Sequence, residues 1–279
     1  MKSIFILIAF LQIHVQAVNS KLIDNKQTAL LKQYQLESSY LEEFPFSEYQ
    51  IINSFCQGKF YIDGCDYIKG VLAAGHIWEP EIAELIKRYV KPNTIVIDVG
   101  AHIGTHTMML SRCVQNEGVV IAFEPQAKLC RELSMNLQLN QCANVIPIHC
   151  ALGTHSGVVY LEPVRPNNEG YRCITSKRPT EQVALVMLDA FQLTPVSCIK
   201  IDAESYELEV LKGAYHTIMN NKPVIIIEIG GGWSREQEEN INPKQYLKDV
   251  MDLLENVFNY RIVAISTVTG DYLAIPKTR

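Results

Sequence analysis

The chain has 279 residues, of which 48% are hydrophobic and 20% are charged, and its formal net charge is −5. This composition is that of a globular protein and excludes the collagen-like, low-complexity and disordered classes. The length allows one large domain or two small ones. The acidic balance argues against a broad basic surface, so no nucleic-acid partner is predicted.

The first residues have the pattern of a secretory signal peptide. Lys2 precedes an apolar run from Ile4 to Leu11, and Ala17 supplies a small residue for cleavage. The run is too short to cross a bilayer, so no membrane span is predicted. We expect residues 1–17 to be a signal peptide that directs the protein into the secretory pathway. A cytoplasmic protein with an N-terminal helix is the alternative.

Eight cysteines follow this segment. Their spacing does not determine a disulfide connectivity. The sequence contains no CxxC pair, HExxH motif or EF-hand loop, and so predicts no metal site.

Residues 18–75 are interpreted as an N-terminal cap region. Residues 21–44 are polar with a helical tendency, and residues 45–75 contain the aromatic and glycine residues of short strands and turns. Beyond this region, "EPEIAELIKRYV" places apolar residues at helical spacing, with Pro80 in the first turn. We expect a helix there, at the start of a main domain that spans residues 76–279.

From residue 94 onward, strand-like and helical segments alternate. The strand-like runs are "TIVIDV", "VVIAFE", "NVIPIHC", "SCIKID" and "PVIIIEI", with helical stretches near residues 105–115, 126–140 and 205–220. Strands that are apolar on both faces and alternate with helices favour a parallel sheet covered on both sides, an α/β fold. In the last of these helices we expect Leu208, Leu211, Tyr215 and Ile218 to face the core.

Two further pairs of strands are expected outside this alternation. "GVVYLE" and "VALVML" lie between the third and fourth core strands. After the helical segment "PKQYLKDVMDLLENVF", the runs "YRIVAIS" and "DYLAI" are joined by "TVTG", which is typical of a hairpin. The sequence therefore predicts a mostly parallel sheet that ends in a C-terminal antiparallel hairpin.

The segment "VIDVGAHIGTHT" has the features of a ligand-binding turn. Asp98 stands at the end of the first core strand, and ligands of open α/β sheets bind beyond such strand ends. Gly100 and Gly104 allow a tight turn and a close approach of a ligand to the backbone. His106 and Thr107 begin the next helix, whose free amide groups favour electronegative atoms.

The spacing of the glycines argues against a pyrophosphate. The turn reads GxxxG, with Ala101 where a dinucleotide fingerprint has a second glycine. The second core strand ends in Glu124, whose carboxylate can accept hydrogen bonds from both hydroxyls of a ribose. Asp98 and Glu124 together therefore favour a nucleoside with a cationic or amino-acid tail. The alternative is that Asp98 caps the next helix and Glu124 is a solvated strand end.

Five segments occur in the order typical of one family. "VIDVGAHIGTHT", "AFEPQ", "CALG", "KIDAESYELEVLKGA" and "VIIIEI" resemble the FkbM-type S-adenosylmethionine-dependent methyltransferases, over roughly residues 76–276. The resemblance implies a class I methyltransferase fold, a Rossmann-like sandwich, with S-adenosyl-L-methionine as cofactor. The residues it implies for cofactor binding are Glu79, Asp98, Gly100, His102, Gly104, Glu124, Ala151 and Leu152.

Each part of that set has an implied role. The segment from Asp98 to Gly104 wraps the methionine part of the cofactor, Glu124 binds the ribose hydroxyls, and Ala151 and Leu152 lie near the adenine. Glu79 closes over the cofactor, or alternatively caps the helix that begins at Pro80.

Two positions depart from the family pattern. His102 stands where the family usually has Asn, and an imidazole can still form hydrogen bonds. Ser205 stands where the family has Gly. If the backbone there has a positive φ, serine is strained.

The candidate catalytic residues are acids at the ends of the fourth and fifth core strands. Methyl transfer is an in-line displacement, in which the protein positions the acceptor and removes its proton. Glu204 is predicted to be the base, with acidity at a helix start as the alternative. Asp202 either holds the methionine amino group or orients the acceptor. Glu228 hydrogen-bonds the acceptor or Lys200, or forms a structural salt bridge.

The sequence thus predicts an O-methyltransferase that acts on a hydroxyl of a sugar or small molecule. The oxygen acceptor follows from the resemblance rather than from the pattern. Two alternatives stay open: a catalytically inactive module that binds S-adenosylmethionine, and an NAD-dependent oxidoreductase. Trp233 and Arg235, which follow the fifth strand, are candidates for a substrate loop.

Overall fold

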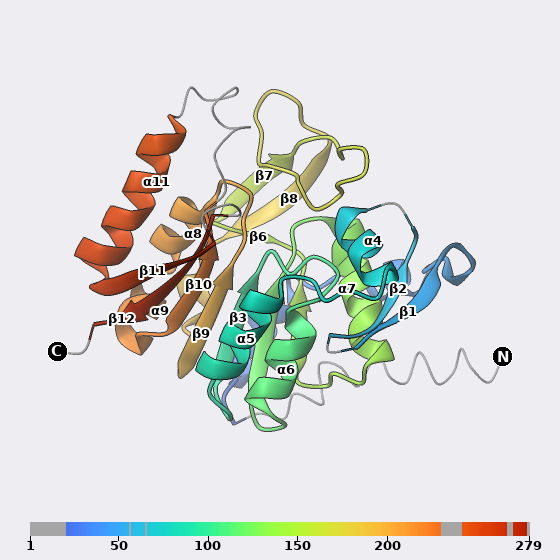
Figure 1. The fold of residues 1–279 in the computed structure, drawn as a ribbon, viewed down its shortest axis with the longest axis horizontal. Coiled ribbons are helices and arrows are strands. Elements are labelled where there is room, and N and C mark those ends of the chain that lie inside the picture. The colour runs from blue at the N-terminus through green and yellow to red at the C-terminus, as the bar shows by residue number, and fades with distance from the viewer. Residues whose placement is uncertain (1–20, 56, 65, 230–241, 267–269, 278–279) are drawn as a thin grey trace.

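The computed structural model describes residues 21–277, except residues 56, 65, 230–241 and 267–269 (Figure 1). The predicted signal peptide, Cys56, Cys65, and the candidate loop residues Trp233 and Arg235 lie outside the described residues. Within the described ranges, no helix combines the length and the apolar character that a membrane crossing requires.

A seven-stranded sheet forms the centre of the molecule. Its strand order is β11-β12-β10-β9-β3-β4-β5, and the five strands from β10 to β5 run parallel, whereas β12 pairs antiparallel with β10 and with β11. The fold is therefore the expected α/β sandwich, a mostly parallel sheet with a C-terminal antiparallel hairpin. The strands are β3 (Ile95–Val99), β4 (Val119–Phe123), β5 (Val145–Ile148), β9 (Val196–Ile201), β10 (Val224–Glu228), β11 (Tyr260–Ser266) and β12 (Asp271–Pro276).

The central strands are buried on both faces, as their sequences predict. Every residue of β3, β4 and β9 is buried. Along β3, Ile95, Ile97 and Val99 belong to the core on one face, and Val96 belongs to the core on the other, because side chains alternate across a strand.

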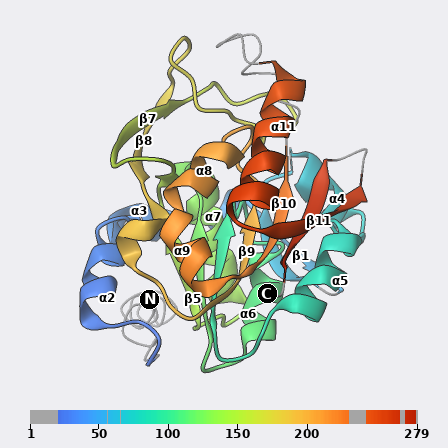
Figure 2. The same cartoon turned by 90° about the vertical axis from the view of Figure 1, so that its left-hand side faces the viewer.

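Helices cover both faces of the sheet (Figures 1 and 2). One face packs against α5 (Pro80–Tyr89), α6 (Thr107–Val114) and α7 (Ala127–Leu139). The other packs against α8 (Glu207–Gly213), α9 (Tyr215–Asn221) and α11 (Pro243–Asp252), which a short π-helical turn, Leu253–Val257, extends. These positions confirm the helices expected from the alternating pattern.

The helix expected over residues 205–220 is divided in two. A side-chain carbon at Gly213 would lie 1.9 Å from the carbonyl oxygen of Gly153, so this position admits only glycine. The division changes which residues face the core. Ala214 and Ile218 are buried, whereas Tyr215, expected in the core, is 40% exposed.

The N-terminal region contains a helix that was not expected. The region consists of α2 (Asn25–Lys32), α3 (Ser38–Glu42), a 3₁₀ turn (Phe46–Glu48), the antiparallel ribbon of β1 (Gln50–Ser54) and β2 (Gly58–Ile62), and α4 (Tyr67–Ala73). The unexpected helix is α4. Strands and turns were expected where α4 forms. Asp66 begins α4 by accepting a hydrogen bond from the backbone amide of Tyr67. Its seven residues are too few for helical periodicity to be recognised.

A second, three-stranded sheet contains the predicted extra pair. Its order is β6-β8-β7, with β6 (Ala151–Leu152), β7 (Gly157–Leu161) and β8 (Glu181–Val186). A 3₁₀ turn, Leu188–Phe191, follows β8. The segment between β7 and β8, residues 162–180, is called the β7–β8 loop below.

The buried sheet makes a prediction for stability. Ile97 is fully buried in β3, whereas Val263, on the edge strand β11, is 41% exposed. We expect Ile97→Ala to lower the free energy of unfolding by about 2–5 kcal/mol, because it leaves a cavity in the core. We expect Val263→Ala to change it by about 0.5 kcal/mol or less. Denaturant titration measures both, and equal losses would contradict the assignment of β3 to the core.

Candidate functional site

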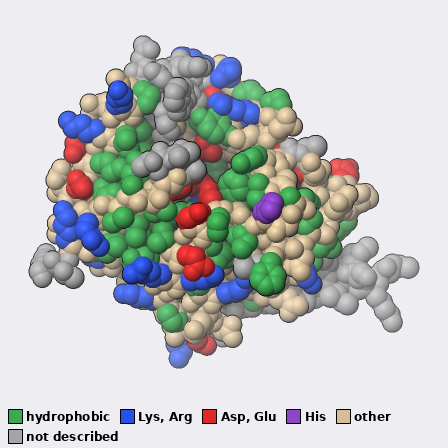
Figure 3. Space-filling model, in the orientation of Figure 1, with side chains coloured by type: hydrophobic (Ala, Val, Ile, Leu, Met, Phe, Trp, Pro, Cys, Tyr) green, Lys and Arg blue, Asp and Glu red, His purple; other side chains and the backbone are tan. Residues whose placement is uncertain are grey.

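A cavity of 420 Å³ opens at the carboxyl ends of β3, β4, β9 and β10. It lies where the strand order reverses, since β3 has β4 on one side and β9 on the other. Figure 3, drawn in the orientation of Figure 1, shows acidic side chains among hydrophobic ones near the middle of the view. The predicted site residues that line the cavity are Glu79, Gly100, His102, Glu124, Ala151, Leu152, Asp202, Glu204 and Glu228.

Asp98 and Gly104 do not line the cavity. Gly104 has a φ of +96°, and a side-chain carbon there would lie 2.7 Å from the side chain of Leu133 in α7, so this glycine allows α6 to approach α7. The Asp98 carboxylate is fully buried and accepts a hydrogen bond from the Thr107 hydroxyl at 2.6 Å. Burial raises the pKa of Asp98, while the charge of Lys200 opposes this.

Gly100 brings the ends of two strands together. Its φ is +74°, and a side-chain carbon there would lie 1.8 Å from the carbonyl oxygen of Asp202. In addition, the backbone amide of Asp202 donates to the carbonyl of Val99 at 3.0 Å. The glycine turn after β3 is therefore in direct contact with the acidic segment after β9.

Glu124 is held in a fixed orientation beneath the glycine turn. Its Oε2 accepts from the backbone amide of His102 at 2.8 Å, and its Oε1 accepts from the amide of Gln126 at 2.9 Å. Glu124 is only 3% exposed, so the alternative of a solvated strand end is wrong. Burial raises its pKa to about 7.

His102 links the glycine turn to the N-terminal cap region. Its φ is +51°, and its Nε2 lies 3.2 Å from Oδ2 of Asp66, the residue that begins α4. Burial alone would raise the pKa of Asp66, but the hydrogen bond and charge of His102 outweigh it and lower the pKa.

Glu79 points into the cavity and does not cap α5. It occupies the N-cap position with a left-handed φ of 44°, yet its side chain makes no capping hydrogen bond, so the capping alternative is wrong. Its carboxylate lies 3.6 Å from Nε2 of the buried His106. Burial raises the pKa of Glu79 to about 7, and burial together with the charge of Lys200 lowers that of His106.

The three predicted catalytic acids surround one end of the cavity. Lys200 donates to Oδ2 of Asp202 at 3.2 Å, in agreement with their common face of β9. Burial, followed by the charge of Asp202, raises the pKa of both Glu204 and Glu228. Glu228 forms no ion pair with any described residue, so a structural salt bridge is not seen in this part of the chain.

Ser205 has the strained backbone that the family pattern suggested. Its φ is +72°, directly after Glu204 at +48°, and two successive non-glycine residues in this region are unfavourable. The amide of Ser205 donates to Oε1 of Glu207 at 2.8 Å, and Glu207 also accepts from the Tyr246 hydroxyl. These bonds hold Glu204 at the cavity despite the strain.

Several cavity residues were missed in the sequence. Tyr67 and Trp78 come from the cap region and its junction with α5, and Asn168, Tyr171 and Arg172 come from the β7–β8 loop. The loop has a length that is uncommon unless it serves a function, and this was the available signal. No pattern in the sequence indicated that the loop folds back over the sheet edge.

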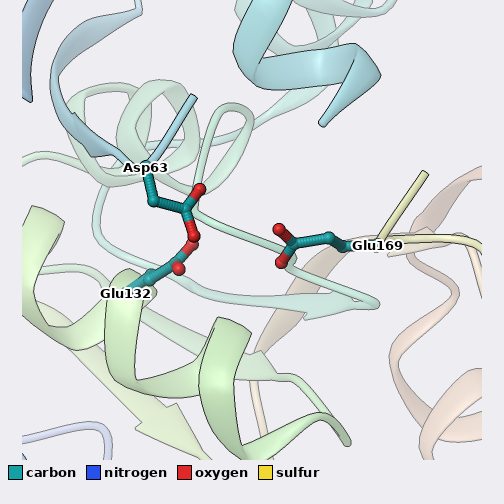
Figure 4. A group of neighbouring side chains, drawn as sticks. All are labelled: Asp63, Glu132 and Glu169. Atoms are coloured by element: carbon teal, nitrogen blue, oxygen red, sulfur yellow. The ribbon is translucent and has the colours of Figure 1, made fainter. Parts of the chain in front are cut away.

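Three carboxylates outside the cavity have the spacing of a metal site. Figure 4 shows Asp63, Glu132 and Glu169, whose oxygen atoms lie within 4.8 Å of one another. Lys69 lies 2.7 Å from Asp63 and 2.8 Å from Glu132, and Lys128 lies 2.7 Å from Glu169. The two ammonium groups offset most of the negative charge of this cluster, which joins the cap region, α7 and the β7–β8 loop.

The close contact at Gly100 gives a prediction with a matched control. Gly75 also has a positive φ, +80°, but a side-chain carbon there would meet nothing within 4 Å. Gly75→Ala should therefore cost about 1–2 kcal/mol, from backbone strain alone. Gly100→Ala should cost more, because it also displaces Asp202. Denaturant unfolding of both variants tests this, and an equal loss would show that the contact is unimportant.

The raised pKa of Glu228 predicts a pH dependence of stability. Its pKa rises from the ordinary 4.5 to about 10 in the fold, so above pH 4.5 the native state binds more protons than the unfolded chain. The free energy of unfolding should fall as the pH rises through this window.

The matched variants are Glu228→Gln and Glu117→Gln. Glu117 is exposed in the turn before β4. Glu228→Gln should make the decline in stability between pH 5 and pH 9 shallower, whereas Glu117→Gln should leave it unchanged. Unfolding titrations at several pH values measure the slope, and parallel slopes for all three proteins would contradict the buried environment of Glu228.

Comparison with known proteins places the chain among methyltransferases. The family model of the methyltransferase FkbM domain matches residues 98–262. The hexuronic acid methyltransferase AglP of Haloferax volcanii is 27% identical over 161 residues, which are 55% of this chain and 63% of that protein. This chain therefore spans less than two thirds of that relative.

Solved structures also resemble the chain. A methyltransferase FkbM from Methylobacillus flagellatus has a TM-score of 0.47 and 16% identity, over 90% of this chain and 58% of that one. The fibrillarin pre-rRNA processing protein of Methanococcus jannaschii has a TM-score of 0.43 and 16% identity, over 88% of each chain.

The family model covers more than half of the chain, including the glycine turn, Glu124 and the acidic segment after β9. The match is to a methyltransferase and gives no support to the nicotinamide alternative. The expected cofactor class, S-adenosyl-L-methionine, follows with the family. The chain belongs to the FkbM methyltransferase family.

Proposed function

We propose that the protein transfers a methyl group from S-adenosyl-L-methionine to a hydroxyl oxygen of a sugar. The observation that carries the proposal is the position of Glu204 and Asp202, which follow β9 and line the same cavity as Glu124. The relative AglP bears the name of a hexuronic acid methyltransferase, which supports a sugar as the acceptor.

The cavity residues fit the proposed cofactor. Both oxygens of Glu124 accept one backbone amide each, and each keeps a lone pair for a ribose hydroxyl. The adenine would lie against Ala151 and Leu152, which are buried and line the cavity beside β6. Glu79 and Asp202 would bind the ammonium group of the methionine part. In this arrangement the positively charged methionine part of the cofactor would lie at the acidic end of the cavity.

Asp98 takes a supporting place in this proposal. It lies below the cavity, bonded to Thr107, and its charge acts on Lys200. We propose that it holds the start of α6 and the buried ammonium of Lys200 in place, so that the glycine turn is presented to the cofactor. The sequence predicts that the segment beginning at Asp98 wraps the methionine part of the cofactor. The burial of Asp98 outside the cavity lining favours the supporting role over direct contact.

The proposed reaction is an in-line displacement. The cofactor supplies a methyl group bound to a positively charged sulfur, and the acceptor oxygen forms its bond to carbon as the carbon–sulfur bond breaks. Glu204 takes the hydroxyl proton, which makes the oxygen a better nucleophile. Glu228 accepts a hydrogen bond from a second hydroxyl of the acceptor and orients it.

The raised pKa of Glu204 suits a base that works on a hydroxyl. Burial and the charges of Asp202 and Glu207 raise the pKa, so the carboxylate has a greater affinity for a proton than an exposed glutamate has. Because its pKa is raised, Glu204 must lose its own proton before it can act as a base. The positive charge of the bound cofactor would favour that ionisation. The rate should therefore increase with pH.

Replacing Glu204 tests its role as the base. We expect Glu204→Gln to lower kcat by about 10²–10⁴-fold, because an amide cannot take the proton. The matched control is Glu117→Gln, remote from the cavity. Transfer of a labelled methyl group to sugar acceptors measures the rates, and binding of S-adenosyl-L-homocysteine shows whether the variant keeps its site.

Two results would contradict these assignments. If Glu204→Gln matches the parent protein on a good acceptor, Glu204 is not the base. If the parent protein binds S-adenosyl-L-homocysteine but transfers no methyl group to any sugar, the inactive binding module becomes the better description. In that case the strained Ser205 would be the first residue to examine, through Ser205→Gly.

A further inference from the structure

The β7–β8 loop places an arginine against an aromatic side chain that lines the cavity. The Arg165 guanidinium lies 4.0 Å from the ring centre of Tyr171, which lines the cavity. The loop makes this contact by turning back on itself: Asn168 donates its backbone amide to the Arg165 carbonyl and accepts from the amide of Tyr171. The arginine and the aromatic ring are thus presented together.

The charge of Arg165 also acts on the proposed base. Burial and the charges of Asp202 and Glu207 raise the pKa of Glu204, and Arg165 is the first charge that acts in the opposite direction. Arg165 does not itself line the cavity, but its guanidinium packs against Tyr171, which does.

Other cations at the cavity are already committed to the protein. Arg172 donates to the carbonyl of Glu162, to the side chains of Gln126 and Thr180, and to Glu181. Lys200 is 6% exposed and bonded to Asp202. By contrast, the Arg165 side chain is 43% exposed, and besides the Tyr171 ring it contacts the Glu162 carboxylate at 3.3 Å.

Glu162 does not depend on Arg165 for its charge partner. Its carboxylate is 2% exposed, and Arg178 approaches its other oxygen, Oε1, at 3.2 Å. Arg165 can therefore turn toward a ligand while Glu162 keeps a cation beside it. Removing Arg165 should not leave a buried charge without a partner.

We propose that the acceptor is an acidic sugar, a uronic acid, whose carboxylate Arg165 binds while the hydroxyl to be methylated reaches Glu204. A guanidinium matches a carboxylate with two parallel hydrogen bonds, and the Tyr171 ring supplies a flat surface against which a sugar ring can lie. This inference rests on the proposed function and makes Arg165 the residue that selects the acceptor.

Paired acceptors isolate the contribution of the carboxylate. Methyl glucuronoside and methyl glucoside differ only in a carboxylate in place of a hydroxymethyl group, and methyl glucosaminide supplies a cationic sugar. The parent protein should prefer the glucuronoside in kcat/KM. Arg165→Gln should raise KM for the glucuronoside by about 10–100-fold, the effect of losing a charged hydrogen bond, and leave the glucoside unchanged.

Two variants complete the test. Arg165→Lys keeps the charge without the paired geometry and should recover part of the preference. Arg178→Gln removes the other cation beside Glu162. The Arg178 side chain is 62% exposed, and its removal should leave the preference intact. Unfolding and S-adenosyl-L-homocysteine binding of each variant confirm that the fold and cofactor site persist.

Several results would overturn the inference. Equal losses on both acceptors in Arg165→Gln, or a parent preference for the glucoside or glucosaminide, would show that Arg165 does not select a carboxylate. An alkali-labile product would mean that the carboxylate itself is methylated, since an ester is cleaved by base and an ether is not. Cofactor binding without transfer to any of the three sugars would instead count against the proposed function, and the inference would fall with it.

Discussion

The carboxyl edge of the sheet is organised around one buried ammonium group. Lys200 lies in β9, at the centre of the sheet, and its charge acts on Asp98, Asp202 and Glu79. Burial alone would lower its pKa, but these three carboxylates outweigh burial and raise it. An unpaired acid in this position would be costly. Lys200 therefore allows a group of acids to be kept at the edge of an otherwise apolar core.

That arrangement explains the division of roles among the acids. Asp98 lies deepest and contacts Thr107. Asp202 keeps a direct bond to Lys200, whereas Glu204 and Glu228, further along the rim, are left with raised pKa values because burial and like charges dominate. A ligand that carries a positive charge relieves this repulsion, so the electrostatics of the cavity favour a sulfonium or an ammonium group.

Much of this structure could be predicted from the sequence, and the limits have physical causes. The buried strands and the hairpin follow from hydrophobic periodicity, and the strand-end acids follow from their register. Periodicity could not predict α4, whose start depends on Asp66, or the break at Gly213, which depends on a contact with Gly153. Likewise, the loop residue Tyr171 reaches the cavity, with Arg165 packed against its ring, through contacts that no local pattern encodes.

The most direct test is a crystal structure of the protein with S-adenosyl-L-homocysteine. We expect the ribose hydroxyls to bind Glu124, the adenine to lie beside Leu152, and the amino group of the homocysteine part to face Asp202 or Glu79. A nucleoside bound elsewhere, with the cavity between β3 and β9 left empty, would contradict this arrangement.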